Sequence, residues 1–342
     1  MRPAGGRAYL ARVSIPAIVT AGDGAASKAV YGDNKAYLEL GGQALVVRVV
    51  GVLQLVPEVS EVWIVGNAER LGELFAREDV RAGIHKPLHI VPQFRNLYEN
   101  AWQTYRRLLP GAGPDGRDPT GDEINQAVLY LSSDLPFATP QEISDFVRRS
   151  TELGGDYVVG LASEESLMDF YPSATGEPGI RVAYFNVREG RFRQSNLHFA
   201  KPARIGNRQY IEDMYEHRYQ KEFGHIARMA STILRSEQGG IRILFLYVLM
   251  HLAGVANRHG FRRVANLIRR FVSLAAVSRA ISSLLRTDYY FTVTEIGGCA
   301  VDIDQEGEYD VATLRFDEWF AAQTEKAERI LGPAALPPGE DT

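Results

Sequence analysis

The first half of the chain alternates short apolar runs with longer amphipathic ones. The short runs are rich in β-branched residues and end at glycine or polar residues, which predicts buried strands. We expect strands at residues 15–21, 59–65, 88–92, 126–131 and 157–161. Apolar residues at helical spacing predict helices at residues 44–55, 68–77, 97–109 and 140–151. This alternation predicts a mostly parallel sheet covered on both faces, with ligands bound beyond the carboxyl ends of the strands.

The second half of the chain has a different pattern, with paired strands and long helical stretches. We expect strands at residues 181–187, 191–198, 291–296 and 299–303, and helices at residues 209–234 and 316–330. These patterns predict a core at residues 1–238, a basic helical insertion at 239–287, a return to the core sheet with a closing helix at 288–332, and a disordered tail at 333–342.

Composition adds limits on the class of protein. The 342 residues are 45% hydrophobic and 23% charged, which is typical of a globular chain. A net charge of -4 gives no general reason to expect nucleic-acid binding. The single cysteine, Cys299, has no partner for an internal disulfide, which favours a reducing compartment such as the cytoplasm. The N-terminus lacks the apolar core of a secretory signal, and the longest apolar run, residues 243–256, is shorter than the ~20 residues of a membrane-spanning helix.

The loop after the first strand combines small residues with two lysines. Small residues let backbone N–H groups approach an anion closely, and lysines add positive charge, so the loop is suited to phosphates. It is neither a Walker A sequence nor a complete dinucleotide fingerprint, and an ordinary strand-to-helix loop is the alternative interpretation. The candidate phosphate-binding residues are Ala21, Gly22, Asp23, Gly24, Lys28 and Lys35.

Two groups of carboxylates are candidates for a cation site. Asp134 follows the strand at residues 126–131 in the sequence Ser-Asp-Leu-Pro, where an aspartate can hold Mg²⁺ against substrate phosphates. Asp302 and Asp304 alternate in Val-Asp-Ile-Asp, so a strand would place both on one face without an obvious basic partner. The alternatives are a turn or capping role for Asp134 and a solvated strand end for the other two.

The order of these elements resembles that of the MobA-like nucleotidyltransferases, which have a GT-A-like, Rossmann-like fold. Lys35 precedes Leu-Gly-Gly, Asp134 precedes Leu-Pro, and an Asp-x-Asp pair comes late in the chain. The resemblance covers residues 14–165 and returns at 290–315. It implies a three-layer α/β enzyme that transfers a nucleoside monophosphate from a nucleoside triphosphate to a phosphorylated small molecule, with release of pyrophosphate. A sugar or polyol phosphate is the implied acceptor, and similarity to the polyol-phosphate branch favours CTP as the donor.

The resemblance also implies roles for individual residues. The loop that ends at Lys28 would wrap the triphosphate, and Lys35 would contact the phosphates and support the transition state. Asp134 and Asp304, helped by Asp302, would hold Mg²⁺ as the cofactor.

Other residues bear on the nucleotide base, the acceptor and the competing functions. Asn100 lies near the segment that reads the base in this family, and Asn196 matches an acceptor-side asparagine. Asp23, however, occupies a position that is usually glycine, and an acid beside a triphosphate is unfavourable unless it binds metal or points away. Two alternatives stay open. A metal-dependent GT-A glycosyltransferase that uses a nucleotide sugar would also need an Asp-x-Asp pair, and Asp23 and the basic insertion suggest a catalytically silent nucleotide-binding or assembly protein.

Residues 239–287 contain eight arginines and no aspartate or glutamate. Such a basic amphipathic stretch could lie on an anionic membrane surface, which would place the protein at the inner face of the membrane. It could instead pack on the core or mediate self-association, which we favour because interrupted apolar stripes usually mark cores. Nucleic-acid binding is not expected, since few aromatic residues are interleaved. The apolar residues at near-helical spacing are Phe261, Val264, Ile268, Phe271, Ala275, Ile281 and Leu285.

Overall fold

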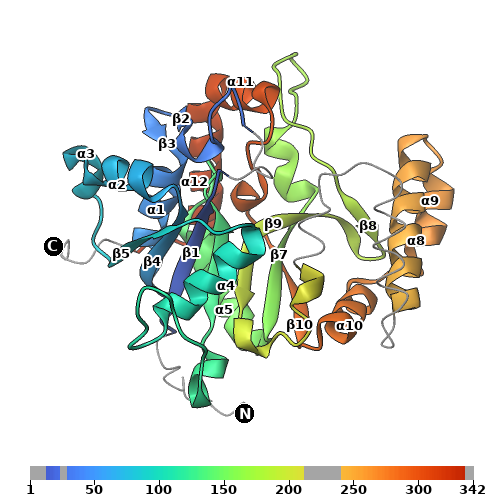
Figure 1. Ribbon diagram of the computed structural model, residues 1–342. Helices are drawn as coiled ribbons and strands as arrows, with labels where there is room; N and C mark the ends of the chain where they lie inside the picture. Colours follow the sequence, from blue (N-terminus) through green and yellow to red (C-terminus); the bar gives the residue numbers. More distant parts are fainter. Residues whose placement is uncertain (1–12, 24–28, 212–239, 336–342) are drawn as a thin grey trace, which may run out of the picture.

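The computed structural model describes residues 13–23, 29–211 and 240–335. An eight-stranded mixed sheet forms its centre, in the order β10-β7-β9-β6-β1-β4-β5, and β8 pairs with β9 (Figure 1). The strands are β1 (Ile15–Ala21), β4 (Val59–Gly66), β5 (Leu88–Pro92), β6 (Val128–Ser132), β7 (Tyr157–Ser163), β8 (Phe185–Val187), β9 (Gly190–Ala200) and β10 (Tyr289–Thr294). A separate two-stranded ribbon joins β2 (Glu39–Leu40) to β3 (Gln43–Ala44).

Most of the pairs in the central sheet are parallel, which confirms the expected α/β class. Strand β1 pairs in parallel with β4 and β6, β4 with β5, and β10 with β7. Strand β9 is the exception, because it runs antiparallel between β6 and β7. The register pairs Thr20 with Ser132, so the carboxyl ends of β1 and β6 lie next to each other. Side chains at these two strand ends therefore meet at one edge of the sheet.

Helices cover both faces of the sheet and make three layers. Side chains alternate along β1, so Ala17 and Val19 face one layer and Ile18 faces the other. The first face packs against α1, α2 and α5, and the second packs against α4. The helices of the core are α1 (Leu45–Gln54), α2 (Ala68–Ala76), α3 (Glu78–Arg81), α4 (Leu97–Leu108), α5 (Pro140–Leu153), α11 (Glu306–Leu314) and α12 (Phe316–Leu331).

The described part of the expected helical stretch at residues 239–287 contains three helices. These are α8 (Gly240–Arg258), α9 (Arg262–Arg269) and α10 (Leu274–Leu285). Gly260, with a φ of 80°, ends the first of them, because a left-handed backbone cannot continue a right-handed helix. Within the described residues, no helix combines the length and the apolar character that crossing a bilayer requires. Most of the helix expected at 209–234 and of the tail expected at 333–342 lies outside the described residues.

The prediction of a strand at residues 299–303 is wrong. Residues Gly298–Ala300 form a 3₁₀ turn, and residues 301–304 are not paired with any strand among the described residues. The apolar residues Val301 and Ile303 are nevertheless buried, while Asp302 and Asp304 between and after them are partly exposed. The apolar and polar residues of this segment thus alternate because Val301 and Ile303 are buried in an extended segment. The segment has no strand-to-strand hydrogen bonds among the described residues.

Candidate active site

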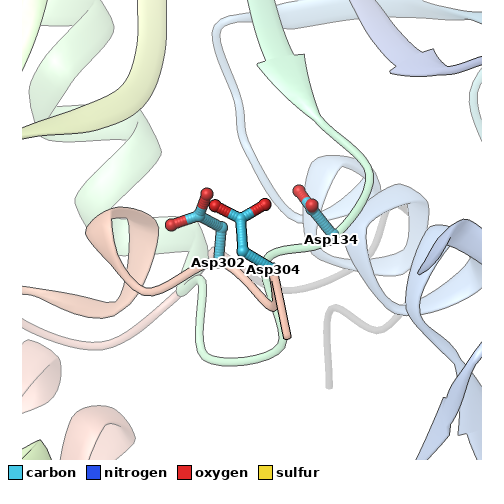
Figure 2. Close-up of side chains that lie close together, drawn as sticks. All are labelled: Asp134, Asp302 and Asp304. Atoms are coloured by element: carbon cyan, nitrogen blue, oxygen red, sulfur yellow. The ribbon is translucent and has the colours of Figure 1, made fainter. Parts of the chain in front are cut away.

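Three carboxylates from distant parts of the chain meet at the carboxyl edge of the sheet. Asp134 lies just after β6, whereas Asp302 and Asp304 lie on the extended segment that follows β10. Figure 2 shows the three side chains close together, and one oxygen of each lies within 4.8 Å of the others. The backbone N–H of Ile303 donates to the carbonyl of Asp134 at 3.4 Å, which ties the two segments together.

A glycine allows the two segments to approach each other. Gly298 lies against the loop after β6, where a Cβ in its place would be 1.9 Å from the carbonyl oxygen of Phe137. On the other side, the buried carboxylate of Glu142 accepts a hydrogen bond from the backbone N–H of Cys299 at 3.0 Å. Residues 298–304 are therefore positioned by backbone packing and by α5 before any ligand is considered.

Lys35 lies between two of the carboxylates. Its ammonium is 2.5 Å from Asp134 Oδ2 and 2.7 Å from Asp304 Oδ1. The side chain belongs to a short 3₁₀ turn, Lys35–Tyr37, that Asn34 caps by accepting from the N–H of Ala36 at 2.9 Å. Burial alone would lower the pKa of Lys35, but the charges of the two carboxylates outweigh it and the pKa is raised. Lys35 is therefore a firmly charged cation at neutral pH.

Asp302 has a basic partner, so the expectation of an unpartnered carboxylate pair is wrong. The Arg193 guanidinium, on β9, lies 2.6 Å from Asp302 Oδ1 and also donates to the carbonyl of Ala300 at 2.7 Å. Burial raises the pKa of Asp302, and the neighbouring charges of Asp134 and Asp304 raise it further, against the opposing effect of Arg193. Arg193 is a site residue that sequence analysis missed, because nothing near Asp302 in the sequence identifies it.

The cluster has the chemistry expected of a magnesium site. Its donors are carboxylate oxygens, which Mg²⁺ prefers, and they are close enough to share one ion. Three carboxylates face two cations, Lys35 and Arg193, so one negative charge is not balanced by these side chains. A divalent cation together with the phosphates of a nucleotide fits this charge. The residues present are therefore compatible with Mg²⁺.

Residues 21–23 are the described start of the phosphate-loop candidate. They begin at the end of β1, beside the carboxylate cluster. Ala21 ends β1, and its carbonyl accepts from the side-chain amide of Asn34 at 3.3 Å. The backbone N–H of Asp23 donates to Gln93 Oε1 at 2.8 Å, and the Asp23 side chain is exposed. Gly24 and Lys28 lie outside the described residues, so the structure does not place them.

Asn100 lies directly across from the start of this loop. A Cβ at Gly22 would be 3.1 Å from the Asn100 amide nitrogen and 3.3 Å from Gln93 Oε1. Asn100 is buried, and its side-chain oxygen accepts from the backbone N–H of Phe94 at 2.6 Å. Asn100 thus links α4, the segment after β5 and the loop after β1. Gln93 is not among the expected site residues, although it follows a predicted strand end as Gly22 and Asp134 do.

A cavity of about 180 Å³ opens between α4 and β9, next to the ends of β1 and β6. Asn196 lines it, together with Thr20 and Ser132 from the two strand ends. The Ser132 hydroxyl donates to the Asp134 carboxylate, so the cavity and the carboxylate cluster share a wall. Aromatic side chains form much of the rest of the lining: Tyr98, Trp102, Tyr130, Tyr157 and His198.

Fold and site together define an α/β domain with a lysine and a carboxylate cluster at the carboxyl edge of a mostly parallel sheet. Within the chain, residues 17–175 match the family model of the MobA-like NTP transferase domain. This match confirms the resemblance inferred from the sequence. It includes Lys35, Asn100 and Asp134 but ends before Asn196, Asp302 and Asp304.

Two known proteins show how far the likeness extends. A curated relative, 2-C-methyl-D-erythritol 4-phosphate cytidylyltransferase from Chlorobium luteolum, is 28% identical over 141 residues. That match covers 41% of this chain and 56% of the relative, so it spans little more than half of the relative's length. A solved structure, a hypothetical transferase from Thermus thermophilus, is similar with a TM-score of 0.57 at 18% identity and covers 86% of this chain and 99% of its own. The second likeness shows the fold.

Proposed function

We propose that this protein transfers a nucleoside monophosphate from a nucleoside triphosphate to a phosphorylated small molecule and releases pyrophosphate. The observation that carries the proposal is the position of Lys35, between Asp134 and Asp304 at the sheet edge where the phosphate-loop candidate begins. A cation held by two carboxylates and next to a strand-end loop is suited to polyphosphate chemistry. The family match over residues 17–175 supports the same class of reaction.

The reaction needs alignment and charge neutralisation more than it needs a protein base. An oxygen of the acceptor phosphate attacks the α-phosphorus, a new P–O bond forms, and the bond from the α-phosphorus to the bridging oxygen breaks. Pyrophosphate leaves with the bonding electrons. Lys35 would stabilise the charge that develops on the phosphates. Mg²⁺ held by Asp134 and Asp304, with Asp302 nearby, would supply further positive charge.

The nucleotide is proposed to lie along the ends of β1 and β4. Backbone N–H groups at the start of the loop would hold the triphosphate with Lys28, and the Asp23 N–H would exchange its bond to Gln93 Oε1 for one to a phosphate oxygen. Asn100 would read the base, since it lies against Gly22. CTP is the proposed donor because the curated relative is named a cytidylyltransferase.

The acceptor is proposed to be a sugar or polyol phosphate bound in the cavity beside Asn196. The cavity shares Ser132 with the carboxylate cluster, so an acceptor phosphate at its mouth would face the α-phosphorus. Aromatic rings suit the apolar face of a carbohydrate, and the Asn196 amide suits its hydroxyl groups. The proposed location of this activity is the cytoplasm. Helices α8 and α9 would face the inner surface of the membrane.

Pyrophosphate release provides the test. Each of the four nucleoside triphosphates is incubated with Mg²⁺ and a panel of sugar and polyol phosphates, and an Asp134→Asn variant is run in parallel. Acceptor-dependent release that is lost in the variant supports the proposal. Hydrolysis of nucleotide sugars without pyrophosphate release would indicate a glycosyltransferase instead. If no triphosphate raises the melting temperature with Mg²⁺ present, the protein is a silent member of the fold.

A further inference from the structure

Helices α8 and α9 carry two rows of exposed apolar side chains. The row on α8 consists of Phe245, Val248, Leu252 and Val255, and the row along α9 of Phe261, Val264, Leu267 and Phe271. The α8 row follows helical spacing and lies on one face of that helix. In the second row, Val264 and Leu267 lie on α9, and Phe261 and Phe271 lie just beyond its two ends. These eight residues are more than half of the fifteen large apolar side chains that are exposed among the described residues. We refer to the two rows together as the α8–α9 surface.

The opposite side of α8 already packs on the body of the protein. Leu246 is buried, and Leu249 and Met250 pack with it against a cluster that includes Phe192 of β9 and Val272. Figure 1 shows α8 and α9 side by side at the edge of the molecule, beyond β8. The buried face of α8 therefore explains how the helix pair α8–α9 is attached to the rest of the protein. It does not explain the exposed apolar rows of the α8–α9 surface. Exposed apolar side chains gathered on two neighbouring helices usually mark a contact site.

This finding changes the interpretation of the basic stretch. The favoured expectation for its apolar stripe was packing on the core or on a second copy of the chain. Packing on the core is wrong for the first part of the stripe, because Phe261 and Phe271 have exposed fractions of 64% and 67%. Toward the end of the stripe the expectation is confirmed, since Leu285 is buried.

The charge of the surface favours a negatively charged partner. Residues 239–287 carry eight arginines and no acidic residue, although the chain as a whole has a net charge of -4. Arg262, Arg263 and Arg270 are exposed beside the α9 row, and none of the three has an ion-pair partner within the described residues. Arginine side chains can pair with phosphate groups while their stems cover apolar surface. Apolar rows flanked by unpaired arginines are typical of helices that lie in the interface of an anionic bilayer.

We propose that the α8–α9 surface binds anionic lipid membranes, with its apolar rows in the acyl boundary and its arginines at the headgroup phosphates. A second copy of the chain is a poorer partner, because a symmetric contact would bring the same arginines together without acidic residues to balance them. Since no described helix is suited to span a bilayer, the contact is peripheral.

The test measures co-sedimentation of the full chain with vesicles at low and high salt. Vesicles of phosphatidylcholine with phosphatidylglycerol should bind the protein, vesicles of phosphatidylcholine alone should bind it weakly, and salt should release it. A variant that combines Phe261→Ser and Phe271→Ser should bind these vesicles more weakly by about tenfold or by a larger factor. Because both residues are exposed, the melting temperature should not change.

Matched controls distinguish binding through the α8–α9 surface from nonspecific binding to vesicles. Leu314→Ser removes an apolar side chain that is 71% exposed on α11, far along the chain from α8 and α9, and should leave binding unchanged. Arg262→Gln with Arg263→Gln should weaken binding roughly thirtyfold, because each basic residue near a membrane contributes ~1 kcal/mol. Arg77→Gln with Arg329→Gln makes the same change in net charge at exposed sites elsewhere and should have little effect.

Three results would overturn the proposal. The first is a lack of sedimentation with phosphatidylglycerol vesicles at low salt. The second is an equal loss of binding in the control and surface variants. The third is a protein that fails to bind vesicles but forms a concentration-dependent dimer that Phe261→Ser with Phe271→Ser dissociates, which would assign the surface to a second copy.

Discussion

The Cα of Gly298 lies so close to the backbone of Phe137 that a Cβ in its place would be 1.9 Å from the Phe137 carbonyl oxygen. This contact joins the loop that carries Asp134 to the segment that carries Asp302 and Asp304. Gly298→Ala should therefore force the two segments apart, which would lower the free energy of unfolding by about 1–3 kcal/mol and reduce activity more than stability alone explains. Denaturant unfolding and pyrophosphate release measure the two effects.

Gly307→Ala is a matched control for this prediction. Gly307 lies on α11, just after the same segment, and a Cβ there would meet no atom within 4 Å. Because alanine favours a helix over glycine, this variant should be neutral or more stable by about 0.5–1 kcal/mol. A Gly298→Ala protein as stable and active as the Gly307→Ala protein would show that the contact is not needed.

Lys35→Met should abolish turnover while the protein stays folded. The substitution keeps an unbranched side chain but removes the charge between Asp134 and Asp304, so kcat should fall by ~10²-fold or more. Lys326→Met is the control, because Lys326 also pairs with a carboxylate, Asp169 at 3.0 Å, but in another part of the fold. Comparable kcat values in the two variants would remove Lys35 from the proposed site.

Asp304→Asn should remove the response to magnesium. If Mg²⁺ and CTP bind the folded protein together, a ligand concentration of about 100 times the Kd stabilises it by about 2.7 kcal/mol, which appears as a higher melting temperature. The variant should lose most of this shift, whereas Asp122→Asn, an exposed substitution on the far loop before β6, should keep it. A full magnesium shift in Asp304→Asn would place the ion elsewhere.

The buried carboxylate of Glu142 predicts a dependence of stability on pH. Burial raises the pKa of Glu142 to about 7, and the hydrogen bonds from the Cys299 N–H and the Thr294 hydroxyl only partly oppose it. In the unfolded chain the pKa is the ordinary value of 4.5. Because the folded state binds the proton more tightly, this contribution is complete below pH 4.5 and is lost as the pH rises through 7, by up to ~3 kcal/mol.

Unfolding measured between pH 5 and pH 8 checks this contribution. The wild type should lose stability over that range relative to Glu142→Gln, whose side chain does not titrate. Parallel curves for the two proteins would mean that Glu142 is charged in the folded state at pH 5.

Sequence patterns predict the core of this fold well, because each buried strand is short, apolar and bounded by polar residues. Strand β5 has the predicted bounds, and β1 does as well. The incorrect prediction of a strand at residues 299–303 shows what an alternating pattern does not determine. Val301 and Ile303 are buried as a strand would bury them, but hydrogen-bond partners are decided by neighbours that periodicity does not reveal.

The site is predictable only where its residues belong to motifs that follow one another in a characteristic order. Lys35, Asp134 and Asp304 were identified from motif order and lie together. Arg193 was missed because it lies in the middle of β9, where alternation does not distinguish a salt-bridge partner from a solvated side chain. Antiparallel insertion of β9 between β6 and β7 brings Arg193 to Asp302, and a local pattern does not reveal such an insertion.

The edge strand β10 has a consequence for how the protein is made. It pairs in parallel with β7, opposing Tyr289 to Tyr157, and the segment after it delivers Asp302 and Asp304. A nascent chain that has emerged only as far as β7 could pair β1 with β4 and β6, but Lys35 and Asp134 would then face no second carboxylate. Such long-range pairing forms late. The complete carboxylate cluster can therefore form only after residue 304 has been synthesised and the segment that follows β10 has folded onto the sheet.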